Sequence, residues 1–326
     1  MAGWRRGRWL GDRTHEMAEI LIGSDKARSK RGPCVVTVGA FDGVHVGHQD
    51  IVRTAIATAR DRGVSSCVVT FDPHPAAYAG IEGFRYLTSL DDRLEYLDAT
   101  GVDVIRVLPF DADLAKTPPD EYIRDVLVGG LGAVAVVVGA THRFGRGGKG
   151  DVALLDHMSA HLAFTVQLVP ATLWNGEIIS SSRIREAVSD GRMADAREML
   201  GRPYSLLGEV VEGDHRGAEL GFPTANLAPP PRRVLPALGI YAAIAEAGGT
   251  AYPAGVHVGP VPTFGCEKPT IEAHLLDFEG DLVGRRLRLS LLRRLRGIVR
   301  FDNREELARQ IGQDLDLVRS VVADHQ

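Results

Sequence analysis

The chain has few cysteines and no long hydrophobic run, and each shortage excludes a class of protein. Three cysteines in 326 residues, with no C-x-x-C pair among them, exclude a disulfide framework and a zinc knuckle. Unpaired thiols are typical of a reducing compartment, so we expect a cytoplasmic protein. No stretch of about 18 apolar residues occurs, and the arginine-rich start lacks the apolar core of a secretory signal, so we expect no membrane segment.

An excess of charge of one sign is also missing. The formal net charge is −4 at pH 7, which provides no basic field for nucleic acid. We therefore expect no nucleic-acid partner. A hydrophobic fraction of 44% with 25% charged residues is typical of a globular protein, and 326 residues suggest two domains.

Residues 33–200 alternate between strand-like and helix-like patterns. Valine-rich apolar runs, as at residues 34–41 and 65–72, predict buried strands. Residues 48–63 and 89–101 have helical spacing and end in glycine, a common helix terminator. This alternation predicts an α/β, Rossmann-like domain in which helices cover both faces of a parallel sheet.

The sequence pattern changes near residue 201. Proline and glycine become frequent, and short apolar segments follow one another with turn residues between them, which predicts a small antiparallel β-barrel. Apolar residues with helical spacing from Leu307 to Val322 predict a C-terminal helix that packs back on the barrel. The expected organisation is a flexible leader at 1–32, an α/β domain at 33–200 and a β-barrel domain at 201–326.

Two histidines stand three residues apart in GAFDGVHVGH, residues 39–48, directly after the first predicted strand. At the start of a helix, His45 and His48 would share one face and point toward the end of that strand. An open parallel sheet binds its ligand there, and a helix N-terminus favours phosphate. Zinc is a competing interpretation, although HExxH spacing is absent and no third ligand is obvious. Plain structural packing of both rings is a third.

A second polar segment, ISSSRIREAV at residues 179–188, places hydroxyl and guanidinium groups at the start of a predicted helix. Serine hydroxyls, backbone N–H groups and the side chains of Arg183 and Arg185 could all meet phosphate oxygens there. The alternative is an ordinary serine N-cap followed by a solvated arginine face. The segment alone leaves both interpretations open.

Together the two segments resemble motifs of the nucleotidylyltransferases that carry an HxGH signature. TFDPHP at 70–75, GFPTAN at 221–226 and EAHLLDFEGDLVG at 272–284 extend the likeness. Over residues 33–326 the chain resembles the prokaryotic bifunctional riboflavin kinase/FMN adenylyltransferases, or FAD synthetases. The resemblance implies that the first domain adenylylates FMN to FAD and releases pyrophosphate. The second would phosphorylate riboflavin to FMN, with ATP as the nucleotide substrate and Mg²⁺ as the metal.

The resemblance also implies roles for residues of the first domain. His45, His48 and Arg183 would be catalytic, because they neutralise charge that develops on the α-phosphate as pyrophosphate leaves. His74, in the third motif, would be a further nucleotide contact. The residues expected to bind nucleotide or flavin are Gly39, Phe41, Asp42, Gly43, His74, Thr141, Arg143, Ser181, Ser182 and Arg185.

The second domain has no G-x-x-x-x-G-K-[ST] loop, so its phosphoryl transfer must use other groups. Thr224 and Asn226 offer neutral oxygens to a Mg²⁺ held mostly by water and ATP. Glu272, in an apolar strand, could accept the proton of the attacking ribityl hydroxyl. A plain turn and a solvated strand carboxylate are the alternatives. The expected site comprises Gly221, Pro223, Thr224, Asn226 and Glu272.

The chain departs from the family pattern at four positions, one of which is Val283, before Gly284, where the family reads LYG. Thr141 and His142 stand where the family has Asp or Asn followed by an aromatic residue, and His257 stands where it has Asn. An imidazole differs from an amide in size and titration. The departures keep two alternatives open. One is a nucleotidylyltransferase for a modified flavin or another phosphorylated acceptor, with a degenerate kinase domain. The other is a non-catalytic flavin sensor.

Overall fold

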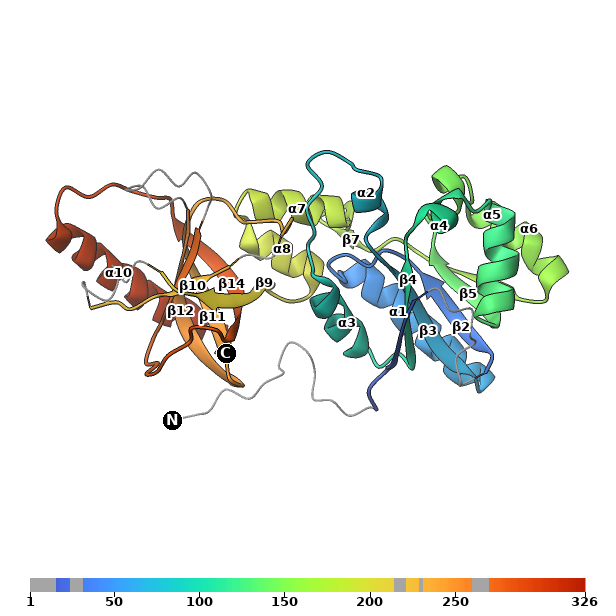
Figure 1. Ribbon diagram of the computed structural model, residues 1–326, viewed down its shortest axis with the longest axis horizontal. Coiled ribbons are helices and arrows are strands. Elements are labelled where there is room, and N and C mark those ends of the chain that lie inside the picture. The colour runs from blue at the N-terminus through green and yellow to red at the C-terminus, as the bar shows by residue number, and fades with distance from the viewer. Residues whose placement is uncertain (1–15, 24–31, 214–220, 229–230, 260–269, 326) are drawn as a thin grey trace. The chain divides into compact units, whose positions relative to one another are not determined.

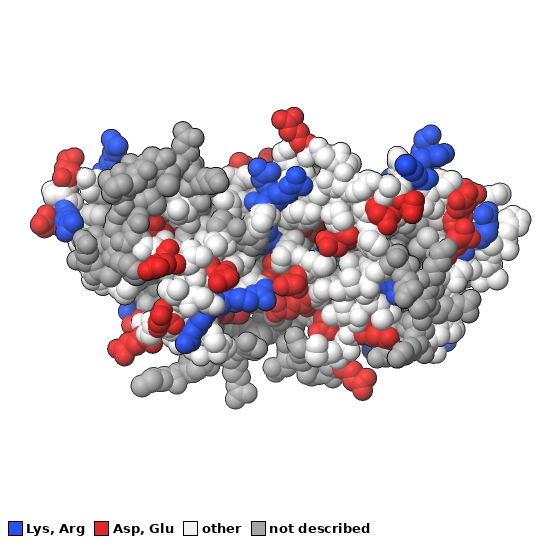
Figure 2. All heavy atoms as spheres, in the orientation of Figure 1, with Lys and Arg blue, Asp and Glu red and all other residues white. Residues whose placement is uncertain are grey.

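The computed structural model forms two compact units, which divide between Ser181 and Ser182 (Figure 1). We call them the N-terminal and the C-terminal unit. On the face seen in Figure 2, acidic and basic side chains are interspersed among uncharged ones. No helix among the described residues is long and apolar enough to cross a membrane. The structure describes residues 16–23, 32–213, 221–228, 231–259 and 270–325.

A six-stranded parallel sheet forms the centre of the N-terminal unit, in the order β1-β4-β3-β2-β5-β6. β2, β3 and β4 are buried along nearly their whole length, because both faces of the sheet are covered. The predicted α/β domain is thereby confirmed. The strands are β1 (Glu19–Ile22), β2 (Cys34–Val38), β3 (Ser65–Asp72), β4 (Val104–Pro109), β5 (Ala133–Gly139) and β6 (Thr165–Val169).

Helices cover the two faces through separate apolar clusters. Val69 of β3 packs in a cluster with η1 and α6, while its neighbour Val68 packs in one with α1 and α3. Successive strand residues point to opposite faces, so the clusters lie on opposite sides of the sheet. The helices and the remaining short elements are α1 (Val46–Arg62), α2 (Pro75–Tyr78), α3 (Leu90–Asp98), α4 (Ala112–Lys116), α5 (Pro119–Glu121), the π-helix η1 (Tyr122–Gly130), η2 (Arg146–Gly148), α6 (Val152–Leu162), and the β7 (Leu173–Trp174) and β8 (Glu177–Ile178) hairpin.

β1 corrects the interpretation of residues 1–32 as a flexible leader at residues 19–22, while residues 1–15 and 24–31 lie outside the described residues. Glu19 lies opposite Val104, and the strand runs parallel to β4 at one edge of the sheet. Its alternating, half-exposed side chains are typical of an edge strand. A smaller correction concerns the second predicted helix, which ends at Asp98 rather than at residue 101.

A closed six-stranded antiparallel barrel forms most of the C-terminal unit, in the order β10-β13-β12-β11-β14-β9. The pairing of β9 with β10 closes the barrel. In β13, Ile271, Ala273 and Leu275 are buried, whereas Glu272 and His274 between them are partly exposed. The predicted barrel is thereby confirmed. Its strands are β9 (Tyr204–Val211), β10 (Ala225–Leu227), β11 (Gly239–Ala247), β12 (Thr250–Gly259), β13 (Thr270–Leu275) and β14 (Arg286–Arg296).

Three helices belong to this unit: α7 (Ser181–Ser189), α8 (Met193–Leu200) and α10 (Arg304–Ala323). α10 packs Val318, Val321 and Val322 on the outer face of the barrel, as its apolar spacing predicts. Its N-cap is Asn303, whose side chain accepts from the Glu306 N–H at 2.8 Å.

Candidate active site

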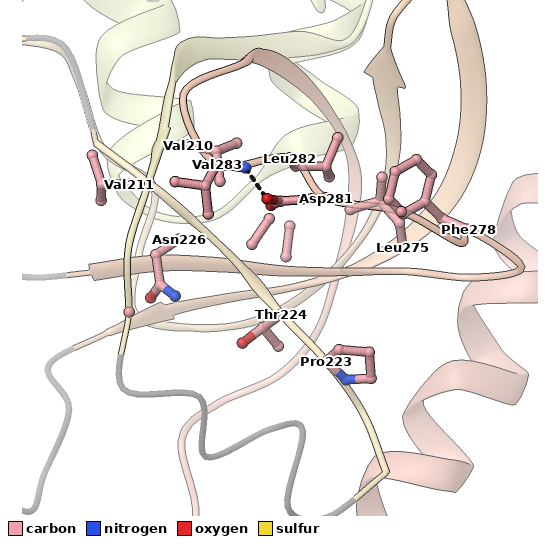
Figure 3. Close-up of a pocket in the computed structure, with 14 residues that line it drawn as sticks. Val210, Val211, Pro223, Thr224, Asn226, Leu275, Phe278, Asp281, Leu282 and Val283 are labelled. Atoms are coloured by element: carbon pink, nitrogen blue, oxygen red, sulfur yellow. Dashed lines mark hydrogen bonds between the residues drawn. The ribbon is translucent and has the colours of Figure 1, made fainter.

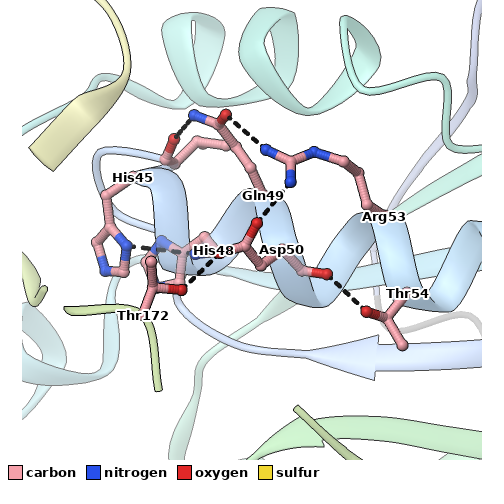
Figure 4. A network of polar contacts seen from close by, with 8 residues as sticks. His45, His48, Gln49, Asp50, Arg53, Thr54 and Thr172 are labelled. Atoms are coloured by element: carbon pink, nitrogen blue, oxygen red, sulfur yellow. Dashed lines mark hydrogen bonds and ion pairs between the residues drawn. The ribbon is translucent and has the colours of Figure 1, made fainter. Parts of the chain in front are cut away.

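His45 lies between β2 and α1, and His48 lies in the first turn of α1 (Figure 4). His45 is the N-cap of α1, and its Nδ1 accepts a hydrogen bond from the backbone N–H of His48 at 3.2 Å. The two rings stack, with centroids 3.5 Å apart and planes at 16°. Phe41 meets the His48 ring edge-on at 5.1 Å. Since Nδ1 of His45 is an acceptor, the neutral ring carries its proton on Nε2, which is a donor suited to an anion.

The loop that carries the histidines has an unusual backbone. Phe41, Gly43 and Val44 have φ angles of 49°, 86° and 40°. Positive φ is uncommon outside glycine and is an outlier for a β-branched residue such as Val44. The N–H of Val44 donates to the Phe41 carbonyl at 3.0 Å, and the side-chain amide of Gln49 donates to the Val44 carbonyl at 2.9 Å. These contacts hold a conformation that the sequence alone would not favour.

Asp42 anchors this loop from inside the protein. Its carboxylate accepts from the Leu87 N–H at 3.0 Å, and from the Thr88 N–H and hydroxyl, each at 2.9 Å. The Thr88 hydroxyl oxygen in turn accepts from the Gly43 N–H at 3.0 Å. The side chain is only 1% exposed. The structure therefore places Asp42 as a support of the histidine loop, whereas the sequence interpretation placed its side chain at the ligand crevice.

Ser181, the last residue of the N-terminal unit, contacts the same loop. Its hydroxyl donates to the Asp42 carbonyl oxygen at 2.8 Å. Ser181 is also the first residue of α7, so Ser182 and Arg183 belong to the first turn of that helix, and Arg185 follows. In general, the N–H groups of a helix's first turn have no partners within the helix, which suits them to an anion.

Aromatic rings gather just after β3 and β4, and the motifs predicted only His74 among them. His74 caps α2 and lies 4.6 Å from the Phe84 ring and 6.1 Å from the Tyr86 ring, between centroids. Tyr78, which is 43% exposed, meets Phe110 at 5.4 Å. In the sequence, only the position of these aromatic residues after the ends of predicted strands could have indicated a role for them. Partly exposed rings at a sheet's carboxyl edge offer a surface on which a planar ligand can stack.

The segment after β5 holds two of the predicted flavin contacts. Thr141 is exposed, and Arg143 donates to Asp151 at 3.1 Å in an exposed ion pair. His142 stacks on Phe144 with ring centroids 5.7 Å apart, and burial lowers the pKa of His142 to about 4. β5 pairs with β2, so this segment and the histidine loop start from neighbouring strands at the point where strand order reverses. Open α/β sheets bind ligands at such a point.

In the barrel, two residues of the predicted kinase site lie side by side with a third polar residue across neighbouring strands. Asn226 of β10 is directly opposite Glu272 of β13, and Glu272 is directly opposite His257 of β12. Residues in this relationship have Cβ atoms roughly 5 Å apart and interact. The structure thus joins two sequence-predicted residues, Asn226 and Glu272, and adds the unusual His257 to them.

Two cavities meet at Thr224, which lines both. The smaller, of about 170 Å³, also contains Pro223, Asn226 and Asp281 (Figure 3). The larger, of about 900 Å³, contains Glu272, and its walls mix charged side chains with apolar ones such as Phe222, Ile240 and Leu315 but expose mainly apolar surface. The larger volume lies in the range of small-molecule sites. Gly221, at the start of the segment that carries Thr224, has a φ of 86°, a value that favours glycine.

A charged pair closes one wall of the larger cavity. Arg296 contacts Asp314 through Nε at 3.0 Å and Nη2 at 2.7 Å, and Gln310 donates to the same carboxylate at 3.0 Å. Burial lowers the pKa of His257, the Glu272 carboxylate raises it, and Arg296 lowers it further. The imidazole beside Glu272 is therefore neutral at pH 7.

Stacked histidines at a helix start, at the carboxyl end of a parallel sheet, together with a barrel that places a carboxylate in the larger of two adjoining cavities, fit a two-unit nucleotide-dependent transferase. A family model described as FAD synthetase matches residues 27–183, and one described as riboflavin kinase matches residues 200–322. No group of three or more potential metal ligands of the His, Cys, Asp or Glu type occurs in the described part of the chain. The zinc interpretation therefore gains no support.

Relatives match nearly the whole chain. It is 35% identical over 283 residues to the bifunctional riboflavin kinase/FMN adenylyltransferase of Escherichia coli K12, covering 86% of this chain and 90% of that protein. The protein of that description from Bacillus subtilis is 33% identical, with 90% and 92% covered. A crystal structure from Streptococcus pneumoniae, described as a macrolide-efflux protein, superposes with a TM-score of 0.83 at 29% identity over 92% and 98% of the two chains. The chain belongs to the bifunctional riboflavin kinase/FMN adenylyltransferase family.

Proposed function

We propose that the two activities of this family are divided between residues 33–200 and residues 201–326 and use the residues described above. The enzyme phosphorylates riboflavin to FMN with ATP and adenylylates FMN to FAD with release of pyrophosphate. The observation that carries the assignment of the second reaction is the stacked pair of His45 and His48 at the start of α1. Family membership carries the pairing of the reactions.

In adenylyl transfer, an oxygen of the FMN phosphate attacks the α-phosphorus of ATP while the bond to the pyrophosphate oxygen breaks. Negative charge accumulates on the phosphate oxygens. The Nε2–H of His45, the neighbouring His48 ring and the N–H groups at the start of α1 supply positive potential there. Ser182, Arg183 and Arg185 are proposed to bind the triphosphate, as the family motif implies.

The flavin of FMN is proposed to lie at the carboxyl edge of the parallel sheet. The partly exposed rings of Tyr78, Phe84 and Phe110 offer stacking partners for the isoalloxazine ring system. Thr141 and Arg143, after β5, are proposed to contact it from the other side of the strand-order reversal. The neutral His142 ring adds no charge to this region.

In the kinase reaction, Glu272 is proposed to accept the proton of the ribityl hydroxyl as that oxygen attacks the γ-phosphorus. The bond from phosphorus to the ADP oxygen breaks and ADP leaves. The larger, mostly apolar cavity suits the flavin, and the smaller one suits the phosphates of ATP. Thr224 lies where the two meet.

Thr224 and Asn226 fit a Mg²⁺ site because they offer neutral oxygens, the ligand type that magnesium accepts beside phosphate and water. When bound, the ion would neutralise phosphate charge. We further propose a cytoplasmic enzyme with small-molecule partners, and a functional boundary between residues 33–200 and 201–326.

Mixing the protein with ATP, Mg²⁺ and FMN tests the assignment of the N-terminal unit. We expect stoichiometric release of pyrophosphate and formation of FAD. A chain that binds flavin but releases no pyrophosphate would be a sensor, and turnover only with another phosphorylated acceptor would favour a divergent transferase.

A further inference from the structure

A buried arginine outside the sequence motifs holds the histidine loop. Arg93 lies in α3 and is 2% exposed. Its Nη1 donates to the Ala40 carbonyl at 2.8 Å, and its Nη2 donates to the Phe71 carbonyl at 2.9 Å. Ala40 belongs to the loop after β2, and Phe71 is near the end of β3. One guanidinium group therefore joins the strand ends that lead to the histidine pair and to His74.

The loop depends on such support because its backbone is strained. Left-handed conformations at Phe41 and Val44 persist only where the surroundings fix them. The supports come from one short stretch, residues 87–93: Thr88 binds the Asp42 carboxylate and the Gly43 N–H, and the guanidinium binds Ala40. α3 and the residues before it act as a brace for the loop.

The position of the charge adds a second effect. Within the described chain, Arg93 makes no ion pair with a carboxylate. Burial lowers its pKa, while the carboxylates of Asp42 and Asp72 raise it at longer range. A guanidinium stays protonated in proteins. Its charge therefore lies close behind the carboxyl edge of the sheet, where the triphosphate would bind.

We propose that Arg93 is a positioning residue for adenylyl transfer. Its fork of two hydrogen bonds fixes the end of β3 against the histidine loop, and through that loop it sets the place of the His45 and His48 rings relative to the α-phosphate. Lysine cannot substitute, because a single ammonium group lacks the planar fork that reaches two carbonyls. The inference rests on the function proposed for the N-terminal unit.

The test compares Arg93→Met, Arg93→Lys and Arg106→Met in the full-length protein, with FAD formation and riboflavin phosphorylation measured on the same samples. Arg106 is a matched control, since it is also buried, at 5% exposure, and lies in β4. A displacement of about 1 Å costs about 100-fold in rate. We expect both Arg93 variants to lose about that factor in kcat for FAD formation, with the KM for ATP within about threefold of wild type and an unchanged kinase rate.

A merely structural role gives a different pattern. It lowers the folded fraction and the melting temperature, and Arg106→Met would then reduce FAD formation as much as Arg93→Met does. That result, or wild-type kcat in Arg93→Met, overturns the inference. If Arg93→Met does not fold, Arg93→Lys decides it, assayed below its melting temperature with kinase activity as the internal standard. A wild-type protein that forms no FAD overturns the proposed function and this inference with it.

Discussion

His257 lies directly opposite Glu272 in the pairing of β12 with β13, so the carboxylate proposed as the kinase base has an imidazole as its cross-strand neighbour. Asn226 flanks the carboxylate from β10. Burial keeps the imidazole neutral at pH 7 by lowering the pKa of His257. A neutral neighbour leaves the carboxylate free to accept a proton, whereas a cationic one would pair with it.

Replacing Glu272 with Gln should remove riboflavin phosphorylation. Loss of a general base costs about 10² to 10⁴ in rate. We expect FAD formation from supplied FMN to continue at the wild-type rate, measured by chromatographic separation of riboflavin, FMN and FAD. His257→Asn is the matched variant, since it keeps a neutral polar side chain and should retain kinase activity. Equal loss of both activities in Glu272→Gln would contradict the assignment.

His48→Ala should have the reverse effect. Removal of one group that stabilises transition-state charge costs about 10² to 10³ in kcat, and we expect that loss in FAD formation alone. His161→Ala, an exposed histidine of α6 in the same unit, serves as control and should leave both rates unchanged. If His48→Ala forms FAD at the wild-type rate, the histidine pair is structural.

Asp42→Asn should destabilise the N-terminal unit and slow FAD formation. The amide keeps the shape of the side chain but loses the negative charge, to which two N–H groups and a hydroxyl now donate hydrogen bonds. Its NH₂ group is itself a donor and would face these donors. Hydrogen bonds to a charged group contribute about 1.5–3 kcal/mol, so we expect a loss of that order in the free energy of unfolding, measured in urea by circular dichroism. Exposed Asp113→Asn is the control. Unchanged stability in Asp42→Asn would refute the anchoring role.

The stability of the N-terminal unit should fall as the pH drops below 6.5. Burial lowers the pKa of His142 from 6.5 to about 4, so between these values the unfolded chain binds a proton that the folded chain does not. Protonation then favours unfolding, and the free energy of unfolding falls with pH by at most about 1.4 kcal/mol per unit for one group. His142→Phe should reduce this slope in thermal unfolding at pH 7, 6 and 5. The same slope in both proteins would show that other groups cause it.

Asp314→Asn should destabilise the C-terminal unit and lower kinase activity, while FAD formation from FMN continues. The change leaves the Arg296 guanidinium, whose side chain is 21% exposed, without its carboxylate. Breaking a buried pair from one side costs about 3 kcal/mol. Asp277→Asn breaks an exposed pair with Arg319 and should change little. If the two substitutions lower the free energy of unfolding in urea equally, the Arg296–Asp314 pair does not support the cavity.

The sequence predicted the α/β domain, the barrel and the helix that covers it, because each rests on local periodicity. β1 escaped prediction since four half-exposed residues at a sheet edge carry little hydrophobic signal. The ends of helices were predicted to within a few residues, because several cap residues compete near each end.

The histidine pair was predicted from its spacing and its place after a strand, and the structure adds that His45 lies before the helix and caps it. The partners of Asp42 and Arg93 were beyond prediction. Leu87 is 45 residues from Asp42 in the chain, and Ala40 is 53 residues from Arg93. Such contacts follow from the packing of the sheet and leave no local pattern.

Thr224 forms part of the wall of both cavities in the barrel. A larger side chain at this position would crowd both ligands proposed for these cavities, so a substitution of Thr224 would change the affinities for ATP and for riboflavin together. Selection that adapts one of these affinities to a new cellular concentration must act elsewhere, on walls that only one ligand touches.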